Sequence, residues 1–336
     1  MPCARVAHEL GAHACPRDMA QTAETLAASE GRLDLLARPR YRARVSPFSM
    51  QPRQTFSQRL DHRLRLWWAY PPRRGEWLTF RYRPHQLRER YTRRRRDEAD
   101  DVWRCCALWQ RTLINKWNSR EFAVKHGARV PDLYWCARLP SRRRLRRLPE
   151  QFVLRPVAGT SRQGVYVVAH GRDLLRNAPF TGAEVRRSIL RAGKMAWTIP
   201  ILAEELVRSD DADQQLPVEY KCHTFGDVIA AVQVIERTGL RAQGHRFYTP
   251  DWRPFSDPMN TDVPEAELRN PPRCLNEMLE LAARLGTAIG TYMRVDFFAS
   301  DVGCVFNEFA STPRHFTPFC DELFGALWDD KFPSAS

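Results

Sequence analysis

The sequence predicts an α+β fold from about residue 100 onward, and three observations support this. Residues 199–207, 218–225 and 228–236 are three apolar stretches of the length and composition typical of strands. Between residues 275 and 289 the apolar side chains recur at helical spacing, which predicts an amphipathic helix. Residues 291–299 and 304–309 flank a Ser-Asp-Val-Gly turn and predict a β-hairpin.

The remaining elements of this region follow from shorter patterns. Residues 114–126 predict a helix that ends near Gly127. Residues 151–154 and 164–169 predict two strands around a turn that contains Gly159 and Gly164. Residues 183–192 predict a further helix. No internal repeat is visible in the sequence.

Charge divides the chain into two unlike halves. Residues 1–150 hold 33 Lys and Arg against 15 Asp and Glu, whereas residues 151–336 hold 20 against 24. A basic front half is compatible with an anionic partner, such as nucleic acid, an anionic membrane surface or an acidic polymer. Only five of the basic residues are lysines, so each lysine is worth inspecting.

The front of the chain predicts little folded structure. Residues 1–50 lack a periodic apolar face, so we expect a poorly ordered segment. Residues 51–110 interleave aromatic residues with arginines, and we expect a basic, helical lead-in to a main domain at 111–330. No apolar run is long enough to cross a bilayer, and no secretory signal is readable. Nine cysteines without a Cys-x-x-Cys motif favour reduced thiols and a cytoplasmic location.

The predicted hairpin carries the most chemistry. Because side chains alternate along a strand, Arg294 and Asp296 share one face and Val295 lies on the other. On the partner strand, the same alternation puts Glu308 on one face with Phe306 and Cys304. Two carboxylates and an arginine on one hairpin could hold Mg²⁺ and a transferring phosphoryl group. The alternative is an ordinary cross-strand salt bridge.

Two further clusters point to a phosphate-bearing ligand. Glu219 and Lys221 face the same side of their strand, roughly 6–7 Å apart by strand rise. That spacing suits one carboxylate on a ribose hydroxyl and one ammonium on a phosphate; the alternative is an exposed ion pair. Arg155 ends a strand just before the glycine turn, and such a turn beside a cation can cradle a phosphate. Most turns of this kind merely join strands.

Taken in order, these segments resemble the ATP-grasp superfamily, and in particular its TupA-like (teichuronopeptide biosynthesis) branch. The resemblance runs from about residue 115 to residue 325 and rests on the order and spacing of its segments. These are residues 115–117, 152–156 with the glycine turn, 201–207, 218–225, 247–252, 293–298 and 307–313.

The resemblance implies two α+β subdomains that grip ATP between antiparallel sheets, and it implies a role for each candidate residue. Lys116, Arg155 and Lys221 would bind the phosphates. Glu204, Glu205, Leu206 and Val207 would form the hinge whose backbone recognises adenine, and Glu219 would bind the ribose. Asp296 and Glu308 would hold Mg²⁺, and Arg294 would steady the acyl-phosphate or tetrahedral intermediate.

Two positions depart from the family pattern. Arg155 stands where the family usually has lysine, so a planar fork replaces a compact ammonium. Ala310 stands where many members have a third metal ligand, usually asparagine, two residues beyond the second carboxylate. Strand alternation places Asn307 on the opposite face from Glu308, so Asn307 could substitute only if a bulge intervenes.

Three functions are compatible with these features. The first is an ATP-dependent carboxylate–amine ligase that works through an acyl phosphate, with an anionic small-molecule or polymeric carboxylate acceptor and an amine. A role in cell-surface polysaccharide or peptide modification would suit the basic front half. The second is a degenerate ATP-grasp protein that binds nucleotide without turnover. The third is a polyanion or nucleic-acid binder on the same scaffold; no zinc-finger, RNP or basic-zipper spacing supports it.

Overall fold

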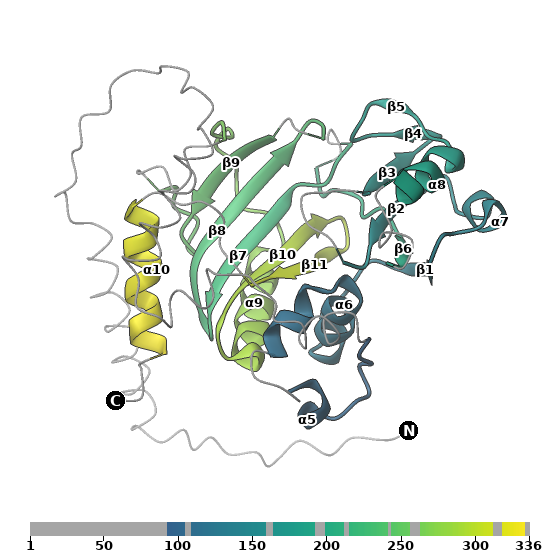
Figure 1. The fold of residues 1–336 in the computed structure, drawn as a ribbon. Helices are drawn as coiled ribbons and strands as arrows, with labels where there is room; N and C mark the ends of the chain where they lie inside the picture. Colours follow the sequence, from purple (N-terminus) through teal and green to yellow (C-terminus); the bar gives the residue numbers. More distant parts are fainter. Residues whose placement is uncertain are drawn as a thin grey trace, which may run out of the picture. The chain divides into compact units, whose positions relative to one another are not determined.

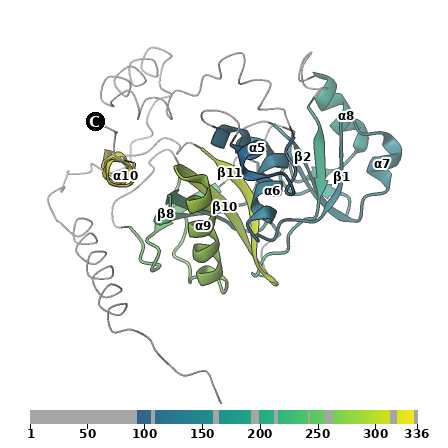
Figure 2. The same ribbon diagram turned by 90° about the horizontal axis from the view of Figure 1, so that it is seen from below.

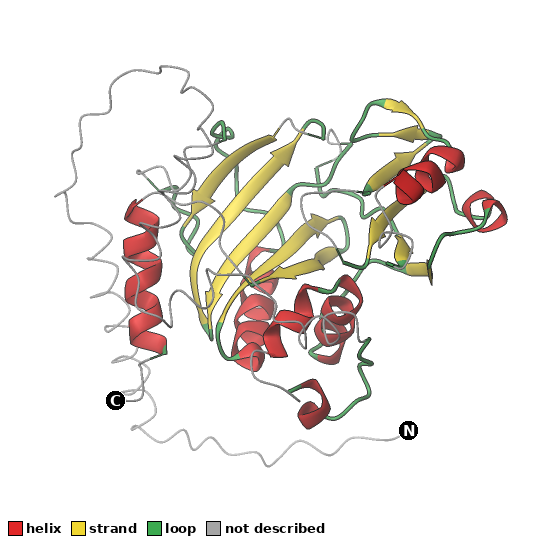
Figure 3. Ribbon diagram, in the orientation of Figure 1, coloured by secondary structure: helices red, strands yellow, loops and turns green. Residues whose placement is uncertain are grey.

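The computed structural model describes residues 93–104, 109–158, 164–191, 199–211, 215–240, 243–255, 263–311 and 318–332. The chain divides into two units, Met1–Arg65 and Leu66–Ser336, and every described residue belongs to the second unit. The predicted segment 1–50, most of the lead-in 51–110 and the tip of the glycine turn at 159–163 lie outside the described residues. The described part is an α+β structure with two antiparallel sheets (Figures 1 and 3).

The larger sheet has five long strands, of six to ten residues each, and carries most of the hydrophobic core. Their spatial order is β11 (Gly303–Ala310), β10 (Tyr292–Ser300), β7 (Glu219–Phe225), β8 (Val228–Arg237) and β9 (Gln243–Tyr248). Along β10 the side chains of Met293, Val295 and Phe297 are completely buried on one face. The strand alternation predicted for this segment is therefore confirmed.

Helix α9 (Leu275–Ile289) covers that face of the larger sheet (Figure 2). Its apolar side chains recur at helical spacing, and Met278 and Leu285 are completely buried against the sheet. The helix ends at Gly290, whose φ of 69° lies in the left-handed region that glycine adopts at little cost. The N–H of Gly290 donates to the carbonyl of Gly286 and closes the last turn.

The smaller sheet has six strands, but they are short, with two to six residues each. Their spatial order is β1 (Leu133–Ala137), β6 (Ile201–Glu204), β2 (Gln151–Pro156), β3 (Tyr166–Ala169), β4 (Arg172–Asp173) and β5 (Ala178–Pro179). Helices α7 (Arg142–Arg146) and α8 (Gly182–Arg191) pack on one face through Leu145 and Val185, against Phe152 and its neighbours. Alternation along β2 turns Arg155 to the other face, into a cavity between the two sheets.

Helix α6 (Lys116–Lys125) joins the two sheets. Short helices α5 (Asp100–Trp103) and η1 (Trp109–Ile114, a 3-10 helix) precede it. The Asn115 side chain accepts hydrogen bonds from the first backbone N–H groups of α6, as an N-cap residue does. The N–H of Lys116 donates to the carbonyl of Val157 at 2.8 Å, and the N–H of Phe309 in β11 donates to Ser119 Oγ at 3.0 Å. These contacts fix the start of α6 beside the cavity.

Helix α10 (Pro318–Lys331) packs on the opposite face of the larger sheet from α9 (Figure 1). Its Phe324 ring lies 5.4 Å from the ring of Phe225 and 6.1 Å from that of Tyr292, measured between centroids. Within the described residues, no helix has the length and apolar character that a membrane crossing requires.

Most of the predicted elements are confirmed. The predicted helices are α6, α8 and α9, and the predicted hairpin is β10 and β11. The strand predicted at 199–207 is confirmed only over β6, since residues 205–207 leave the sheet. Seven elements were not predicted: η1, β1, α7, β4, β5, β9 and α10.

Candidate active site

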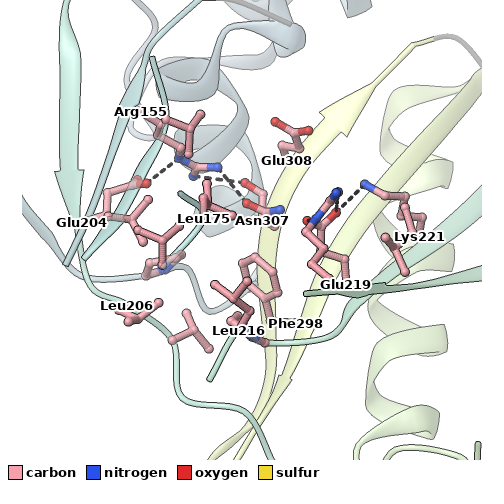
Figure 4. A pocket seen from close by; sticks show the side chains of 18 of the residues that line it. Arg155, Leu175, Glu204, Leu206, Leu216, Glu219, Lys221, Phe298, Asn307 and Glu308 are labelled. Carbon is pink, nitrogen blue, oxygen red and sulfur yellow. Dashed lines mark hydrogen bonds and ion pairs between the residues drawn. The ribbon is translucent and has the colours of Figure 1, made fainter. Parts of the chain in front are cut away.

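A cavity of about 230 Å³ lies between the two sheets, with further walls from α6 and the segment after β6 (Figure 4). Ten of the eleven predicted site residues line this cavity. They are Lys116, Arg155, Glu204, Glu205, Leu206, Val207, Glu219, Lys221, Arg294 and Glu308. The eleventh, Asp296, is completely buried and is not part of the cavity wall. The fold thus gathers residues that are as much as 192 positions apart in the sequence (Lys116 to Glu308).

One end of the cavity is apolar. Leu206, Leu216 and Phe298 line it together and lie in the lower part of Figure 4. The N–H of Glu205 donates to the carbonyl of Asp132 at 2.8 Å, which ties the segment after β6 to the loop before β1. Among the described residues, no hydrogen bond engages the backbone of Leu206 or Val207. Backbone donors and acceptors beside an apolar slot suit a flat heterocyclic ring.

The Glu204 side chain is buried and holds two arginines. Its Oε1 accepts from Arg120 Nη1 at 2.9 Å, and its Oε2 accepts from Arg155 Nε at 2.6 Å. The remaining nitrogens of Arg155 reach across to β11, where Nη1 donates to Asn307 Oδ1 at 2.7 Å and Nη2 to the Asn307 carbonyl at 3.3 Å (Figure 4). Arg155 therefore connects the smaller sheet to the larger one.

Glu219 and Lys221 do share one side of β7, as predicted. Lys221 Nζ lies 3.0 Å from Glu219 Oε2, and both side chains are almost completely buried, so the alternative of an exposed ion pair is wrong. Arg237 of β8 pairs with both oxygens of Glu219. Burial alone would raise the pKa of Glu219, but Lys221 and Arg237 outweigh it and hold the pKa well below its ordinary value. Glu219 is therefore an ionised acceptor.

Asp296 is an ion-pair centre beneath the cavity wall. The Arg294 guanidinium forms a bidentate salt bridge with Asp296, with Nε 2.7 Å from Oδ1 and Nη2 2.8 Å from Oδ2. Lys221 Nζ also lies 2.5 Å from Asp296 Oδ2. Burial would lower the pKa of Arg294, but the Asp296 carboxylate outweighs it and raises the pKa above its ordinary value. The alternative was a cross-strand salt bridge of the hairpin; in the structure Asp296 pairs with Arg294 within β10 and with Lys221 across the ladder to β7.

A β-bulge changes the face on which Glu308 lies. Asp296 pairs with Glu308 and Phe297 pairs with Phe306, so Asn307 is an extra residue in β11. The prediction that Glu308 shares a face with Phe306 and Cys304 is wrong, because the extra residue shifts the alternation by one. Phe306 and Cys304 are in the core under α9, whereas Asn307 and Glu308 both line the cavity.

Glu308 faces the start of α6 across the cavity. Lys116 Nζ lies 3.2 Å from Glu308 Oε2. Burial would raise the pKa of Glu308, but Lys116, Lys221, Arg155 and Arg294 together lower it to about 2. Glu308 is therefore a carboxylate over the whole physiological pH range, and it remains partly accessible from the cavity.

Sequence reasoning missed the polar wall that β8 and β9 contribute. Gln233, Arg237, Gln243 and His245 line the cavity, and Gln233 Nε2 lies 3.0 Å from His245 Nδ1. Only Gln233 left a signal, as the one polar residue inside an apolar run. Across the described ranges, no group of three or more His, Cys, Asp or Glu side chains is arranged to hold a metal ion.

Several solved structures match part of this chain. VanG D-Ala:D-Ser ligase from Enterococcus faecalis is 17% identical, with a TM-score of 0.43, over 66% of this chain and 64% of that chain. D-Alanine–D-alanine ligase from Bacillus anthracis, complexed with ATP, is 14% identical, with a TM-score of 0.42, over 66% of each chain. The ATP-grasp ligase PsnB, complexed with a phosphomimetic variant of its minimal precursor, Mg and ADP, is 15% identical, with a TM-score of 0.37, over 64% of this chain and 58% of that chain.

The aligned regions span less than two thirds of each of these three chains. No curated protein matches the sequence. The TupA-like ATP-grasp family model, in contrast, matches residues 142–331, which is more than half of the 336 residues. The resemblance drawn from the sequence is thereby confirmed, and its first segment, residues 115–117, precedes the matched range. The chain belongs to the TupA-like ATP-grasp family.

Proposed function

We propose that the protein is an ATP-dependent, ADP-forming carboxylate–amine ligase whose active site is the cavity between the two sheets. The observation that carries this proposal is the arrangement of the cavity wall. An apolar slot with open backbone groups lies at one end, and Lys116, Lys221, Arg294 and Glu308 surround the rest. That arrangement complements a nucleoside triphosphate, which is a flat base attached to a polyanion.

The residues present fit the parts of ATP in turn. Leu206 and Val207 would receive the adenine between their backbone groups and the apolar slot. Glu219 would accept hydrogen bonds from the ribose hydroxyls, because Lys221 and Arg237 keep it ionised. Lys116 and Lys221 would neutralise the phosphates, as charge-assisted contacts do in other phosphoryl-transfer sites.

Glu308 and Asp296 are the residues that would hold Mg²⁺, together with phosphate oxygens and water. Their register across the ladder supports this, since they oppose each other directly. In the structure the Lys221 ammonium lies against both Asp296 and Glu219, which shows that these carboxylates can share one cation. A magnesium ion would supply neutralisation of the charge on the transferring phosphoryl group.

The side chains of the protein would position the substrates and stabilise the charge that develops on them during the reaction. The acceptor carboxylate oxygen attacks the γ-phosphorus of ATP, and the bond to the β–γ bridging oxygen breaks, which yields ADP and an acyl phosphate. The amine nitrogen then attacks the acyl carbon, loses a proton, and inorganic phosphate leaves. Arg294, fixed by its fork onto Asp296, would stabilise the negative oxygen that develops in each step.

The finer assignment concerns the substrates. We propose an anionic carboxylate acceptor, either small or polymeric, and a role in the modification of cell-surface polysaccharide or peptide. The excess of Lys and Arg over Asp and Glu in residues 1–150, 33 against 15, supports an anionic acceptor. A cytoplasmic site of action is part of the same proposal.

A second candidate is a protein that binds nucleotide without turnover. Two observations favour it: Ala310 supplies no third metal ligand, and both oxygens of Asp296 already contact Arg294 or Lys221. The experiment that separates the two candidates is an ADP-release assay against a panel of sugar acids and amino acids, with and without magnesium. Magnesium-dependent ADP release that requires both a carboxylate and an amine supports the ligase; nucleotide binding with no release for any pair supports the second candidate.

A further inference from the structure

The bulge in β11 brings Asn307 into the cavity, and its side chain there has a defined orientation. Asn307 and Glu308 are consecutive, and both line the cavity because the bulge interrupts the alternation. The contacts of Asn307 show what its side chain can offer a ligand.

The orientation of the Asn307 amide follows from its partner. Arg155 Nη1 lies 2.7 Å from one end of the amide, and a guanidinium has only donors, so that end must be the oxygen. The Nδ2 group is then the end that points away from Arg155. Among the described residues, no hydrogen bond engages Nδ2. Two N–H donors of Asn307 are thus available to a ligand in the cavity.

The amide is also held rigidly. Arg155 contacts both the side-chain oxygen and the backbone carbonyl of Asn307, so the residue is gripped at two points. Arg155 is itself held by Glu204, and the second oxygen of Glu204 is held by Arg120. Donors fixed in place before binding lose little entropy when a ligand arrives, which is the condition for strong recognition. A lysine at position 155 would offer only one nitrogen for these three contacts.

The same geometry argues against Asn307 as a substitute for the metal ligand that is missing at Ala310. Its Oδ1 lies 2.7 Å from a guanidinium nitrogen, and a divalent cation on that oxygen would be repelled by the neighbouring charge. The end of the amide that remains available is a donor, and donors bind anions. Asn307 thus suits an anionic oxygen next to Glu308, the proposed metal ligand, rather than the metal itself.

We propose that Asn307 is a ligand-contacting residue that donates from Nδ2 to a phosphate oxygen of the bound nucleotide, with Arg155 as its positioning residue. The inference rests on the proposed nucleotide site and adds a contact to it. It also gives a reason for one departure of this chain from the family pattern: the arginine at position 155 orients an amide that faces the phosphates.

The test compares Asn307→Asp with the wild-type protein by calorimetric titration with Mg·ADP and with adenosine. Aspartate keeps the shape and the acceptor for Arg155 but removes the donors and adds a negative charge. Mg·ADP binding should weaken by about tenfold to a hundredfold, the range for a hydrogen bond to a charged group. Adenosine lacks phosphates, so its affinity should stay within about twofold of the wild-type value. The thermal midpoint should stay near that of the wild type, because the contact with Arg155 survives.

Three outcomes would overturn the inference. Unchanged Mg·ADP binding in Asn307→Asp would show that Asn307 makes no contact with the nucleotide, and tighter binding would show that position 307 contacts the metal ion. Equal losses for Mg·ADP and adenosine would show a structural role only. A wild-type protein that binds neither ligand would overturn the proposed nucleotide site together with this contact, and that result is distinguishable because it does not involve the variant.

Discussion

Asp296 and Glu308 lie directly opposite each other across the β10–β11 ladder, yet only Glu308 reaches the cavity. Asp296 is completely buried, where Arg294 and Lys221 contact both of its oxygens. The pair therefore combines a buried carboxylate with an accessible one. The two positions should respond differently to the same chemical change.

Asp296→Asn should strongly destabilise the fold. The amide leaves Arg294 and Lys221 buried with one negative charge fewer, and breaking a buried ion pair in this way costs about 3–5 kcal/mol. Urea unfolding measures the loss. The double variant Asp296→Asn with Lys221→Met removes one surplus cation and should regain part of the stability; a double variant no more stable than the single one contradicts the ion-pair account. ADP release by Asp296→Asn tests the metal role separately, and unchanged turnover rejects it.

Glu308 should stabilise the protein at neutral pH and lose this effect in acid. The pKa of Glu308 is about 2 in the folded protein, below its ordinary value of 4.5, so the stabilisation is present above pH 4.5 and disappears as the pH falls toward 2. Because the side chain is 28% exposed, we expect about 2 kcal/mol at pH 7. The measurement is the difference in unfolding free energy between the wild type and Glu308→Gln from pH 3 to pH 7. A difference that does not shrink toward acid pH would contradict the ionised pairing with Lys116.

Gly286→Ala should disrupt the packing of α9 on the larger sheet. A Cβ at this position would lie 2.0 Å from the Gly226 carbonyl oxygen and 2.9 Å from Thr224 Oγ1, so the helix would have to move. Such overpacking should cost about 3 kcal/mol of unfolding free energy. Thr287→Ala, an exposed change in the same helix, is the matched control and should stay within about 0.5 kcal/mol of the wild type. Equal stability of the two variants would contradict the close approach of α9 to β7.

Local sequence patterns predicted the elements in which apolar side chains recur at a regular spacing. The spacing in α9 and the alternation in β10 depend only on which face is buried, so both could be read directly. β9 could not be predicted in this way, because its sequence Gln-Gly-His-Arg-Phe-Tyr has no apolar alternation: four partly buried residues, of which Gln243 and His245 line the cavity, precede two buried aromatic residues. β4 and β5 have two residues each, too few to show any period.

The site was predictable at the level of residue type, but its contacts depend on tertiary structure. Arg237 and Arg120 belong to the site only because β8 and α6 bring them to Glu219 and Glu204. The bulge at Asn307 is set by how β11 pairs with β10 and packs on α6, which strand alternation alone cannot reveal. The sequence therefore predicted the carboxylates and cations but not which of them would be buried together.

The most direct test of the nucleotide site is a calorimetric titration with Mg·ATP of the wild type, Lys116→Met, Lys221→Met and Lys125→Met. Lys116 and Lys221 line the cavity, whereas Lys125, at the end of the same helix as Lys116, pairs with Asp100 away from the cavity and is the control. We expect the wild type and Lys125→Met to bind alike, and both cavity variants to bind at least about tenfold more weakly, since each loses a charge-assisted phosphate contact. Wild-type affinity in both cavity variants, or no binding by the wild type, would contradict the account.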